Sequence, residues 1–303
     1  MVGTSPATDG GRRMIENLIA LGKARHTDGS IRVVVLKGHS ARFVSPPFGE
    51  LNGFTTILHS ADPGQMASGL FDKSNEDVSA KDLKLMAPID QQEVWAAGVT
   101  YLRSSEARQR ESQGAAVFYD KVYGAERPEL FLKATAKRVK GPDEEVRFRS
   151  DSKWSVPEPE FALVVNANGR IVGLTIGNDM SARDIEGENP LYLPQAKVYQ
   201  GSCSLGPYII LSPSFSSPAD WRLEISIHRQ GKVVFTGNTS MDRMKRSPEE
   251  LVSWLTKELD HPDGVILLTG TGIVPPDDFT LSKGDLVSIR LGDTATLTNP
   301  VGC

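Results

Sequence analysis

The sequence predicts a strand-rich α+β fold with two domains. Short apolar runs rich in β-branched residues recur along the chain without a regular alternation with helical patterns, which argues against a doubly wound parallel sheet. A length of 303 residues is enough for two domains. The extended segment 85–89 is stiffened before Pro88. We therefore expect a small N-terminal α+β domain over 1–87 and a second domain, carrying the chemistry, over 88–303.

The composition and charge exclude several classes of function. Hydrophobic residues make up 39% and charged residues 24%, as in soluble globular proteins, and a net charge of −4 with mixed signs disfavours a nucleic-acid surface. The sequence shows no apolar run of membrane-spanning length, no secretory signal, no zinc motif and no phosphate-binding glycine motif. Two cysteines, Cys203 and Cys303, cannot form a disulfide framework, so we expect a cytoplasmic protein.

The N-terminal part gives weak signals. Ile15, Leu18 and Ile19 recur at helical spacing, so we expect a helix over 12–27, followed by a β-branched strand over 31–36. The stretch from about 37 to 85 has no clear period and carries no residues typical of catalysis.

The second domain is predicted to consist mostly of strands. Asn166-Ala167-Asn168-Gly169 is typical of a hairpin turn between two of them. The clearest helix begins at Ser247, where Pro248 and Glu250 complete an N-terminal capping pattern, and the charged segment 101–114 is compatible with another helix. The expected strands are 94–99, 130–133, 161–165, 171–176, 208–211, 223–228, 232–235, 265–268 and 286–291.

Three acids lie around the predicted hairpin. Glu158 and Glu160 precede an apolar strand at a spacing of two, which places both side chains on one face. Burying two like charges is costly unless a cation compensates them, and carboxylate oxygens suit Mg²⁺, Ca²⁺ or Mn²⁺. Asp179 follows the next strand. Taken alone, the pair fits a solvated strand end, and Asp179 fits a surface turn, equally well.

Other polar residues allow a functional and an ordinary interpretation. Lys197 lies among apolar and aromatic neighbours, where a lysine either extends to solvent or transfers protons. Glu129 and Lys133 share a strand face, which an ion pair on an edge strand also explains. The turn 269–273 (TGTGI) could hold a carboxylate through its N–H groups, although an ordinary tight turn fits the local pattern better. Cys203 is expected to be a buried apolar side chain.

Together these segments resemble the fumarylacetoacetate hydrolase superfamily over roughly residues 90 to 300. The matching motifs are PEPE at 157–160, GNDMSARD at 177–184, Lys197, Gly201-Ser202, LGP at 205–207 and TGT at 269–271. The resemblance implies a mixed β-roll with a smaller N-terminal domain, in homodimers or homotetramers. It also implies that Glu158, Glu160 and Asp179 bind a divalent metal, usually Mg²⁺, with Mn²⁺ or Ca²⁺ as substitutes.

Within the superfamily, segments 127–131, 149–160 and 186–197 are similar to 2-keto-3-deoxy-pentonate dehydratases of arabinose and xylose breakdown, which form 2,5-dioxopentanoate (α-ketoglutarate semialdehyde). Carbon–carbon hydrolases of the superfamily commonly carry a water-activating histidine near the position of segment 100–106. Here the sequence has no histidine between His59 and His228. The resemblance therefore implies a hydro-lyase acting on the xylonate or the arabinonate series.

The implied mechanism assigns further roles. Lys197 and Glu129 are expected to transfer protons, in an order that the sequence leaves open, and Arg183, Lys133 and Thr271 to contact the substrate. Two alternatives remain. One is another enzyme of the superfamily, either an acylpyruvate or diketo-acid hydrolase or an oxaloacetate decarboxylase. The other is a non-catalytic binding module, against which the retention of all three acids and Lys197 argues.

Overall fold

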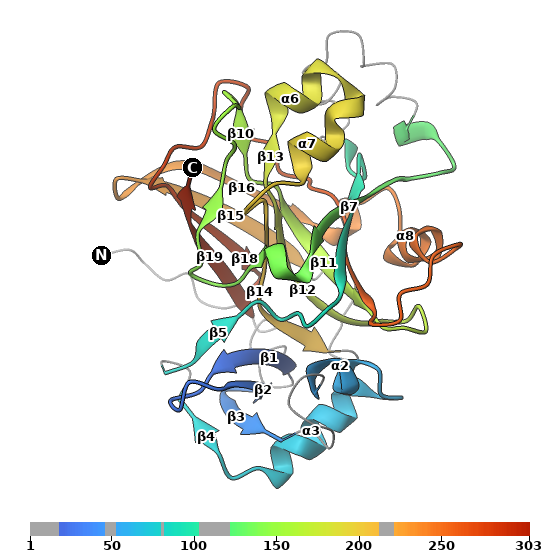
Figure 1. The fold of residues 1–303 in the computed structure, drawn as a ribbon, viewed down its shortest axis with the longest axis vertical. Helices are drawn as coiled ribbons and strands as arrows, with labels where there is room; N and C mark the ends of the chain where they lie inside the picture. The colour runs from blue at the N-terminus through green and yellow to red at the C-terminus, as the bar shows by residue number, and fades with distance from the viewer. Residues whose placement is uncertain (1–17, 46–52, 80–81, 103–121, 212–220) are drawn as a thin grey trace.

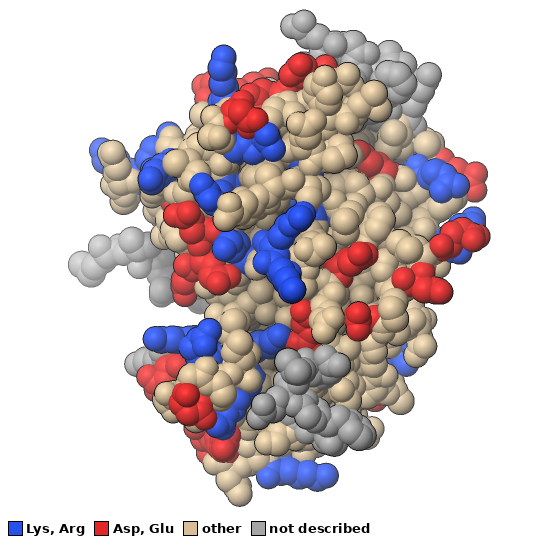
Figure 2. Space-filling model, viewed as in Figure 1, with Lys and Arg blue, Asp and Glu red and all other residues tan. Residues whose placement is uncertain are grey.

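The computed structural model describes residues 18–45, 53–79, 82–102, 122–211 and 221–303. Strands dominate this part of the chain, as the sequence predicts. They form a twelve-stranded sheet, a five-stranded sheet and a two-stranded sheet (Figure 1). The space-filling view shows lysine and arginine side chains interspersed with aspartate and glutamate on one face (Figure 2). Among the described residues, no helix has the length and apolar character needed to span a membrane.

The described residues of the N-terminal part, from Leu18 to Met86, form the lower lobe of Figure 1. Helix α3 begins after Asp62, whose side chain accepts a hydrogen bond from the Gln65 N–H, and Pro63 occupies its first turn. The helix packs against β1 and β2. The elements of this lobe are β1 (Ile19–Arg25), β2 (Ile31–Lys37), β3 (Ser40–Val44), α2 (Gly53–Leu58), α3 (Pro63–Lys73), β4 (Asp77–Val78) and β5 (Lys84–Met86).

The prediction of a helix over 12–27 is wrong for residues 19–25, which form strand β1; residues 12–17 lie outside the described part. Strand β1 pairs with β2 along its whole length and also with β5 and β14. Pairing with the neighbouring strand β2 and with the more distant β5 and β14 thus outweighs the short helix-like spacing. The predicted strand over 31–36 is confirmed as part of β2. Because β1 pairs with β14, the large sheet crosses the proposed division at 87/88, which remains a prediction.

The large sheet has the order β4-β3-β2-β1-β14-β12-β11-β17-β6-β7. The predicted hairpin is confirmed: the Asn166 side chain accepts hydrogen bonds from Asn168 N and Arg170 N, each at 3.1 Å, and Gly169 adopts a φ of +71°. Its strands beyond the N-terminal lobe are β6 (Glu93–Gly98), β7 (Glu129–Thr135), β8 (Val139–Lys140), β11 (Pro159–Val165), β12 (Ile171–Asp179), β14 (Cys203–Leu211) and β17 (Val265–Leu268).

The five-stranded sheet supplies the other half of the main core. Phe161 and Leu163 of the large sheet belong to the same buried cluster as Leu223, Ile225 and Ile289 of the smaller sheet. Its strands are β9 (Val146–Arg147), β15 (Arg222–Arg229), β16 (Lys232–Ser240), β18 (Leu286–Leu291) and β19 (Ala295–Gly302), in the order β16-β15-β18-β19-β9. The apolar strands predicted in the second domain are therefore all present.

Helices are few among the described residues after 88. Helix α8 (Pro248–Leu255) begins as predicted, with the Ser247 hydroxyl accepting a hydrogen bond from the Glu250 N–H. The predicted helical segment 101–114 lies, from residue 103 onward, outside the described residues. The remaining elements are β10 (Ser155–Val156), β13 (Ser181–Ala182), α6 (Arg183–Glu188), α7 (Leu193–Lys197) and the 3-10 turns η1 (Ala136–Arg138), η2 (Pro190–Tyr192) and η4 (Met241–Arg243).

Candidate metal and substrate site

One edge of the large sheet brings together the ends of neighbouring strands. Strands β11 and β12 are antiparallel, so β12 ends where β11 begins. Strand β17 is antiparallel to β11, β6 is parallel to β17, and β7 is antiparallel to β6. The starts of β11 and β7 therefore lie at the same edge as the ends of β12, β17 and β6. Strand ends of this kind are a common location for functional side chains.

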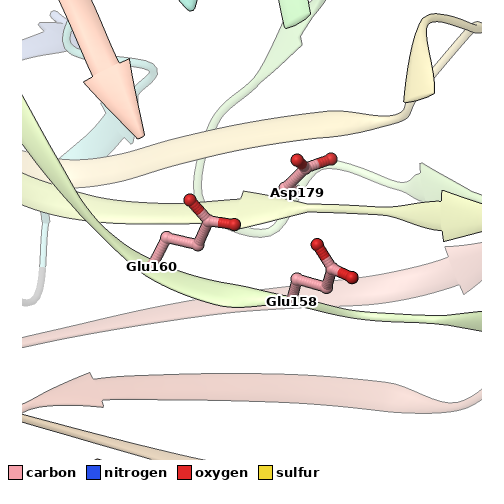
Figure 3. Close-up of side chains that lie close together, drawn as sticks. All are labelled: Glu158, Glu160 and Asp179. Carbon is pink, nitrogen blue, oxygen red and sulfur yellow. The ribbon is translucent and has the colours of Figure 1, made fainter. Parts of the chain in front are cut away.

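The register of the hairpin places the three predicted acids side by side. Pro159 pairs with Asn178 and Glu160 with Gly177, so Glu158 comes opposite Asp179, whose N–H donates to the Glu158 carbonyl oxygen at 2.9 Å. Each of the three side chains offers a carboxylate oxygen within 4.8 Å of the others. Figure 3 shows the three carboxylates around one space. All three side chains are buried, at 1–3% exposure.

Cationic side chains from three different elements surround two of these acids. Arg183 of α6 donates from Nη2 to Glu158 Oε1 at 2.7 Å. Lys197 of α7 donates from Nζ to Glu158 Oε2 at 2.6 Å and to Asp179 Oδ2 at 3.3 Å. Lys133 of β7 forms an ion pair with Asp179 Oδ1 at 2.5 Å. Burial of Glu158 and Asp179 is thus compensated by positive charge.

Glu160 differs from the other two acids. Burial raises the pKa of its carboxyl well above the ordinary value, and the charges of Asp179 and Glu158 raise it further, opposed by Lys197 and the Gly270 N–H. Among the described residues, no lysine or arginine forms an ion pair with Glu160. A buried acid beside two other acids fits a bound divalent cation, and three carboxylates are the oxygen ligands that Mg²⁺ and Ca²⁺ prefer.

The glycine-threonine turn after β17 holds a carboxylate of the protein itself, although an ordinary tight turn fitted its local sequence better. The Gly270 N–H donates to Glu160 Oε2 at 2.6 Å. Gly270 has a φ of +86°, which favours glycine at this position. Thr271 exchanges hydrogen bonds with the backbone of Ile273 at 3.2 Å. The turn therefore orients one of the three acids.

The three acids open into a small cavity. Gly98 pairs with Glu129 across β6 and β7, and a Cβ atom at residue 98 would lie only 2.6 Å from Glu129 Cδ. The absence of a side chain at Gly98 thus makes room for the Glu129 carboxylate beside the cavity. The cavity is lined by Ala97, Gly98, Val99, Glu129, Phe131, Glu158, Glu160, Asp179, Arg183, Glu186, Lys197, Gly270 and Thr271.

Of the predicted catalytic and substrate-contacting residues, Lys197, Glu129, Arg183 and Thr271 line this cavity, whereas Lys133 does not. Their individual roles remain predictions. Glu186, a further cavity acid, was not singled out from the sequence. It is 3% exposed and accepts a hydrogen bond from the Ser181 hydroxyl at 3.0 Å.

A sequence signal for Glu186 exists only once α6 is known. Glu186 follows Arg183 by three residues, and residues three apart on a helix lie on the same face. Helix α6 itself was not predicted, so this spacing had no meaning in the sequence alone.

Cys203, expected to be an apolar side chain, is buried at the start of β14. Burial raises the pKa of its thiol to about 12, which suits the neutral form.

Comparison with known proteins gives a consistent picture. A probable 2-keto-3-deoxyxylonate dehydratase of Haloferax volcanii is 42% identical over 254 residues, which cover 84% of this chain and 87% of that protein. A 2-dehydro-3-deoxy-D-arabinonate dehydratase of Saccharolobus solfataricus is 44% identical over 223 residues, which cover 73% of this chain and 75% of that protein.

A solved structure shows the same likeness. It is described as a 2-keto-3-deoxy-D-arabinonate dehydratase complexed with magnesium and 2,5-dioxopentanoate. It matches with a TM-score of 0.76 and 34% identity, covering 94% of this chain and 98% of the other.

The family model described as fumarylacetoacetate (FAA) hydrolase C-terminal matches residues 93–302. This range includes both strands of the hairpin and every residue that lines the cavity. The chain belongs to the fumarylacetoacetate hydrolase family.

Proposed function

We propose that this protein is a magnesium-dependent dehydratase that converts a 2-keto-3-deoxy-pentonate of the xylonate or arabinonate series into 2,5-dioxopentanoate. The observation that carries the proposal is the buried set Glu158, Glu160 and Asp179, which opens into a small cavity in a chain 42–44% identical to two dehydratases of this class. A solved relative described as holding magnesium and 2,5-dioxopentanoate supports both the metal and the product.

The charge balance of the site supports a divalent ion. Among the described residues, five carboxylates line the cavity, and two of its lining residues, Arg183 and Lys197, are cationic. Lys133, beside Asp179, is a third cation. With every group ionised, the acids exceed the bases by two charges, which one divalent ion would neutralise. Glu158, Glu160 and Asp179 would hold the ion, with Mn²⁺ or Ca²⁺ as substitutes.

When bound, the ion would polarise the 2-oxo group of the substrate and favour loss of a proton from C3. The protein must then move that proton and protonate the departing C4 hydroxyl. Lys197 and Glu129 both line the cavity and can exchange protons, so we assign these two transfers to them; each such transfer contributes roughly 10²–10⁴-fold to a rate. Loss of water and tautomerisation then give the aldehyde.

The remaining residues orient the reactants. Arg183 holds Glu158 and lines the cavity, where its positive charge suits a keto acid anion. Thr271 follows Gly270 and lines the cavity, and we propose that its hydroxyl, which donates to the Ile273 carbonyl oxygen in this structure, turns to the substrate carboxylate. We further propose that the enzyme acts in the cytoplasm. We also propose that it forms a homodimer or homotetramer, and measurement of its mass in solution tests this oligomeric state.

The decisive assay supplies purified protein with Mg²⁺ and each 2-keto-3-deoxy-pentonate epimer, and follows the aldehyde product. EDTA should abolish product formation, and so should Glu160→Gln. Glu224→Gln is a matched control, because Glu224 lies on β15 at the surface and pairs with Arg290. Activity that survives both EDTA and Glu160→Gln would refute the metal-dependent mechanism.

The same assay separates the alternatives. Release of pyruvate from an acylpyruvate or diketo acid, or of CO₂ from oxaloacetate, would instead identify a hydrolase or a decarboxylase of the same superfamily. A protein that binds no Mg²⁺ in a calorimetric titration would be a non-catalytic member. Retention of the three acids and Lys197 in one buried cluster argues against that outcome.

A further inference from the structure

Lys133 has an unusual position in the sheet. Along β6 and β7, Val94 pairs with Ala134 and Trp95 with Leu132, so Lys133 is an extra residue on β7 with no partner on β6. An extra residue of this kind is a β-bulge, and bulges beside active sites redirect a side chain. The lysine side chain is fully buried, at 0% exposure, yet it is not among the residues that line the cavity.

Three oxygen atoms surround the Lys133 ammonium group. Asp179 Oδ1 lies 2.5 Å from Nζ, Nζ donates to the Met180 carbonyl oxygen at 2.9 Å, and it also donates to the Lys197 carbonyl oxygen. An ammonium group has three N–H donors and no acceptor. Two of the three N–H donors are therefore taken by backbone carbonyl oxygens, and the ammonium charge is paired with Asp179 in a fully buried ion pair outside the cavity lining.

The two ends of this contact network belong to the proposed chemistry. Asp179 is a proposed metal ligand, and its other oxygen, Oδ2, faces the Lys197 ammonium at 3.3 Å. Lys197 ends helix α7 and is a proposed proton-transfer residue. The buried ammonium of Lys133 thus contacts both Asp179 Oδ1 and the carbonyl oxygen of Lys197, and so sets the position of these two residues relative to each other.

We propose that Lys133 is a positioning residue, which fixes Asp179 as a metal ligand and the backbone of Lys197, and that it does not contact the substrate. This replaces the role expected from the sequence, and it rests on the proposed magnesium-dependent function. Replacing a residue that orients a metal ligand typically lowers metal affinity or activity 10- to 100-fold.

The test compares Lys133→Met with a matched control, Lys23→Met. Lys23 also pairs with a carboxylate, Asp90 Oδ1 at 2.5 Å, and donates to a carbonyl oxygen, that of Ile89 at 2.7 Å, but it lies on β1 in the N-terminal lobe. Mg²⁺ affinity is measured by calorimetry without substrate. The values of kcat and KM are measured at saturating Mg²⁺, and folding is checked by circular dichroism.

Lys133→Met should weaken Mg²⁺ binding about 10- to 100-fold and lower kcat, with KM within about threefold of the wild type. Lys23→Met should leave all three values unchanged. Unchanged Mg²⁺ affinity with a KM raised tenfold or more in Lys133→Met would overturn the proposal and identify a substrate contact. If wild-type protein binds no Mg²⁺, the proposed function fails instead, so the two failures are distinguishable.

A second measurement needs no variant and decides the matter even if Lys133→Met does not fold. In a crystal structure of the wild-type protein with Mg²⁺ and 2,5-dioxopentanoate, the Lys133 ammonium should remain on Asp179, Met180 and Lys197. Direct contact between this ammonium and the bound dioxo acid would refute the proposal.

Discussion

Replacing Glu160 by glutamine should have opposite effects on stability and on metal binding. The side chain is 1% exposed, and its pKa is raised by burial and by the charges of Asp179 and Glu158. Glutamine has nearly the same shape and no charge, and its amide oxygen can still accept the Gly270 hydrogen bond. The variant should therefore be more stable than the wild type without metal, while losing a ligand charge that Mg²⁺ needs.

The size of the gain follows from the geometry. Two unit charges at the 4.8 Å limit of this cluster repel by ~3 kcal/mol at an effective dielectric constant of about 20. Keeping the carboxyl protonated at pH 7 instead costs at most ~3 kcal/mol, because its ordinary pKa is 4.5 and each unit is worth about 1.36 kcal/mol. Lys197 and the Gly270 N–H stabilise the ionised carboxylate and so offset part of the repulsion. We expect a net gain of ~1–3 kcal/mol, a rise in Tm of several degrees.

The gain should depend on pH with a defined sign. At pH values below 4.5 the carboxyl is protonated in both the folded and the unfolded chain, so it contributes no difference. As the pH rises above 4.5, the unfolded chain releases the proton while the folded chain retains it, and metal-free wild-type protein loses stability. The advantage of Glu160→Gln should therefore be small near pH 5 and fully developed once the pH exceeds the raised pKa.

The assay is urea unfolding of EDTA-treated wild-type protein and Glu160→Gln at about pH 5 and about pH 7, repeated with saturating MgCl₂. Mg²⁺ should stabilise the wild type, because a ligand that binds only the folded state shifts the equilibrium toward it, and should not stabilise the variant. Glu224→Gln controls for loss of a surface carboxylate. A variant that is less stable than wild type at pH 7 in EDTA, or that Mg²⁺ stabilises equally, would refute the reasoning.

Three further predictions test other parts of the structure. Gly98→Ala places a Cβ 2.6 Å from Glu129 Cδ and should displace the Glu129 carboxylate. The value of kcat should fall about 10²-fold or more, while the Mg²⁺ affinity measured by calorimetry stays unchanged. A parallel loss of Mg²⁺ affinity would contradict this prediction. Burial lowers the pKa of His261 below its ordinary 6.5, so the unfolded chain takes up a proton first as the pH falls. The free energy of unfolding of the wild type should therefore drop between about pH 7.5 and 5.5. Urea unfolding at both pH values should show that His261→Gln lacks the part of this drop that His261 causes. Ser247→Ala removes the N-cap of α8 and should cost ~1 kcal/mol in urea unfolding with kcat unchanged, whereas Ser253→Ala at the exposed side of the same helix should cost less.

Local chemistry made parts of the fold predictable. The turn at Asn166–Gly169 and the cap at Ser247 depend on residues within a few positions of each other, and both were confirmed. Strand β1 was predicted as a helix, because its few apolar residues fit both periods and only pairing with β2, β5 and β14 distinguishes them. Helix α3 was missed although Asp62 and Pro63 form an N-terminal signal.

In the candidate site, too, contacts between residues close in sequence were predicted and contacts between distant residues were not. The family resemblance of the motifs around Glu158, Glu160 and Asp179 predicted that these acids meet, and the hairpin that brings them together spans a short distance in sequence. The surroundings of Lys133 were not predicted, since its partners Asp179, Met180 and Lys197 follow it by 46 to 64 residues. A side chain's partners at such separations depend on how the strands are ordered in the sheet, and no local pattern encodes that order.

The strand-rich fold, the hairpin with its three acids and the likeness to a family of metal-dependent enzymes could all be read from the amino-acid sequence. The pairing of each cation with its acid became known from the folded chain. The folded chain also showed that Glu160 is held by Gly270, that Gly98 makes room for Glu129, and that Lys133 is directed to Asp179. The physical reason is that charge compensation in a buried site depends on distances of a few ångströms between chain segments far apart in sequence.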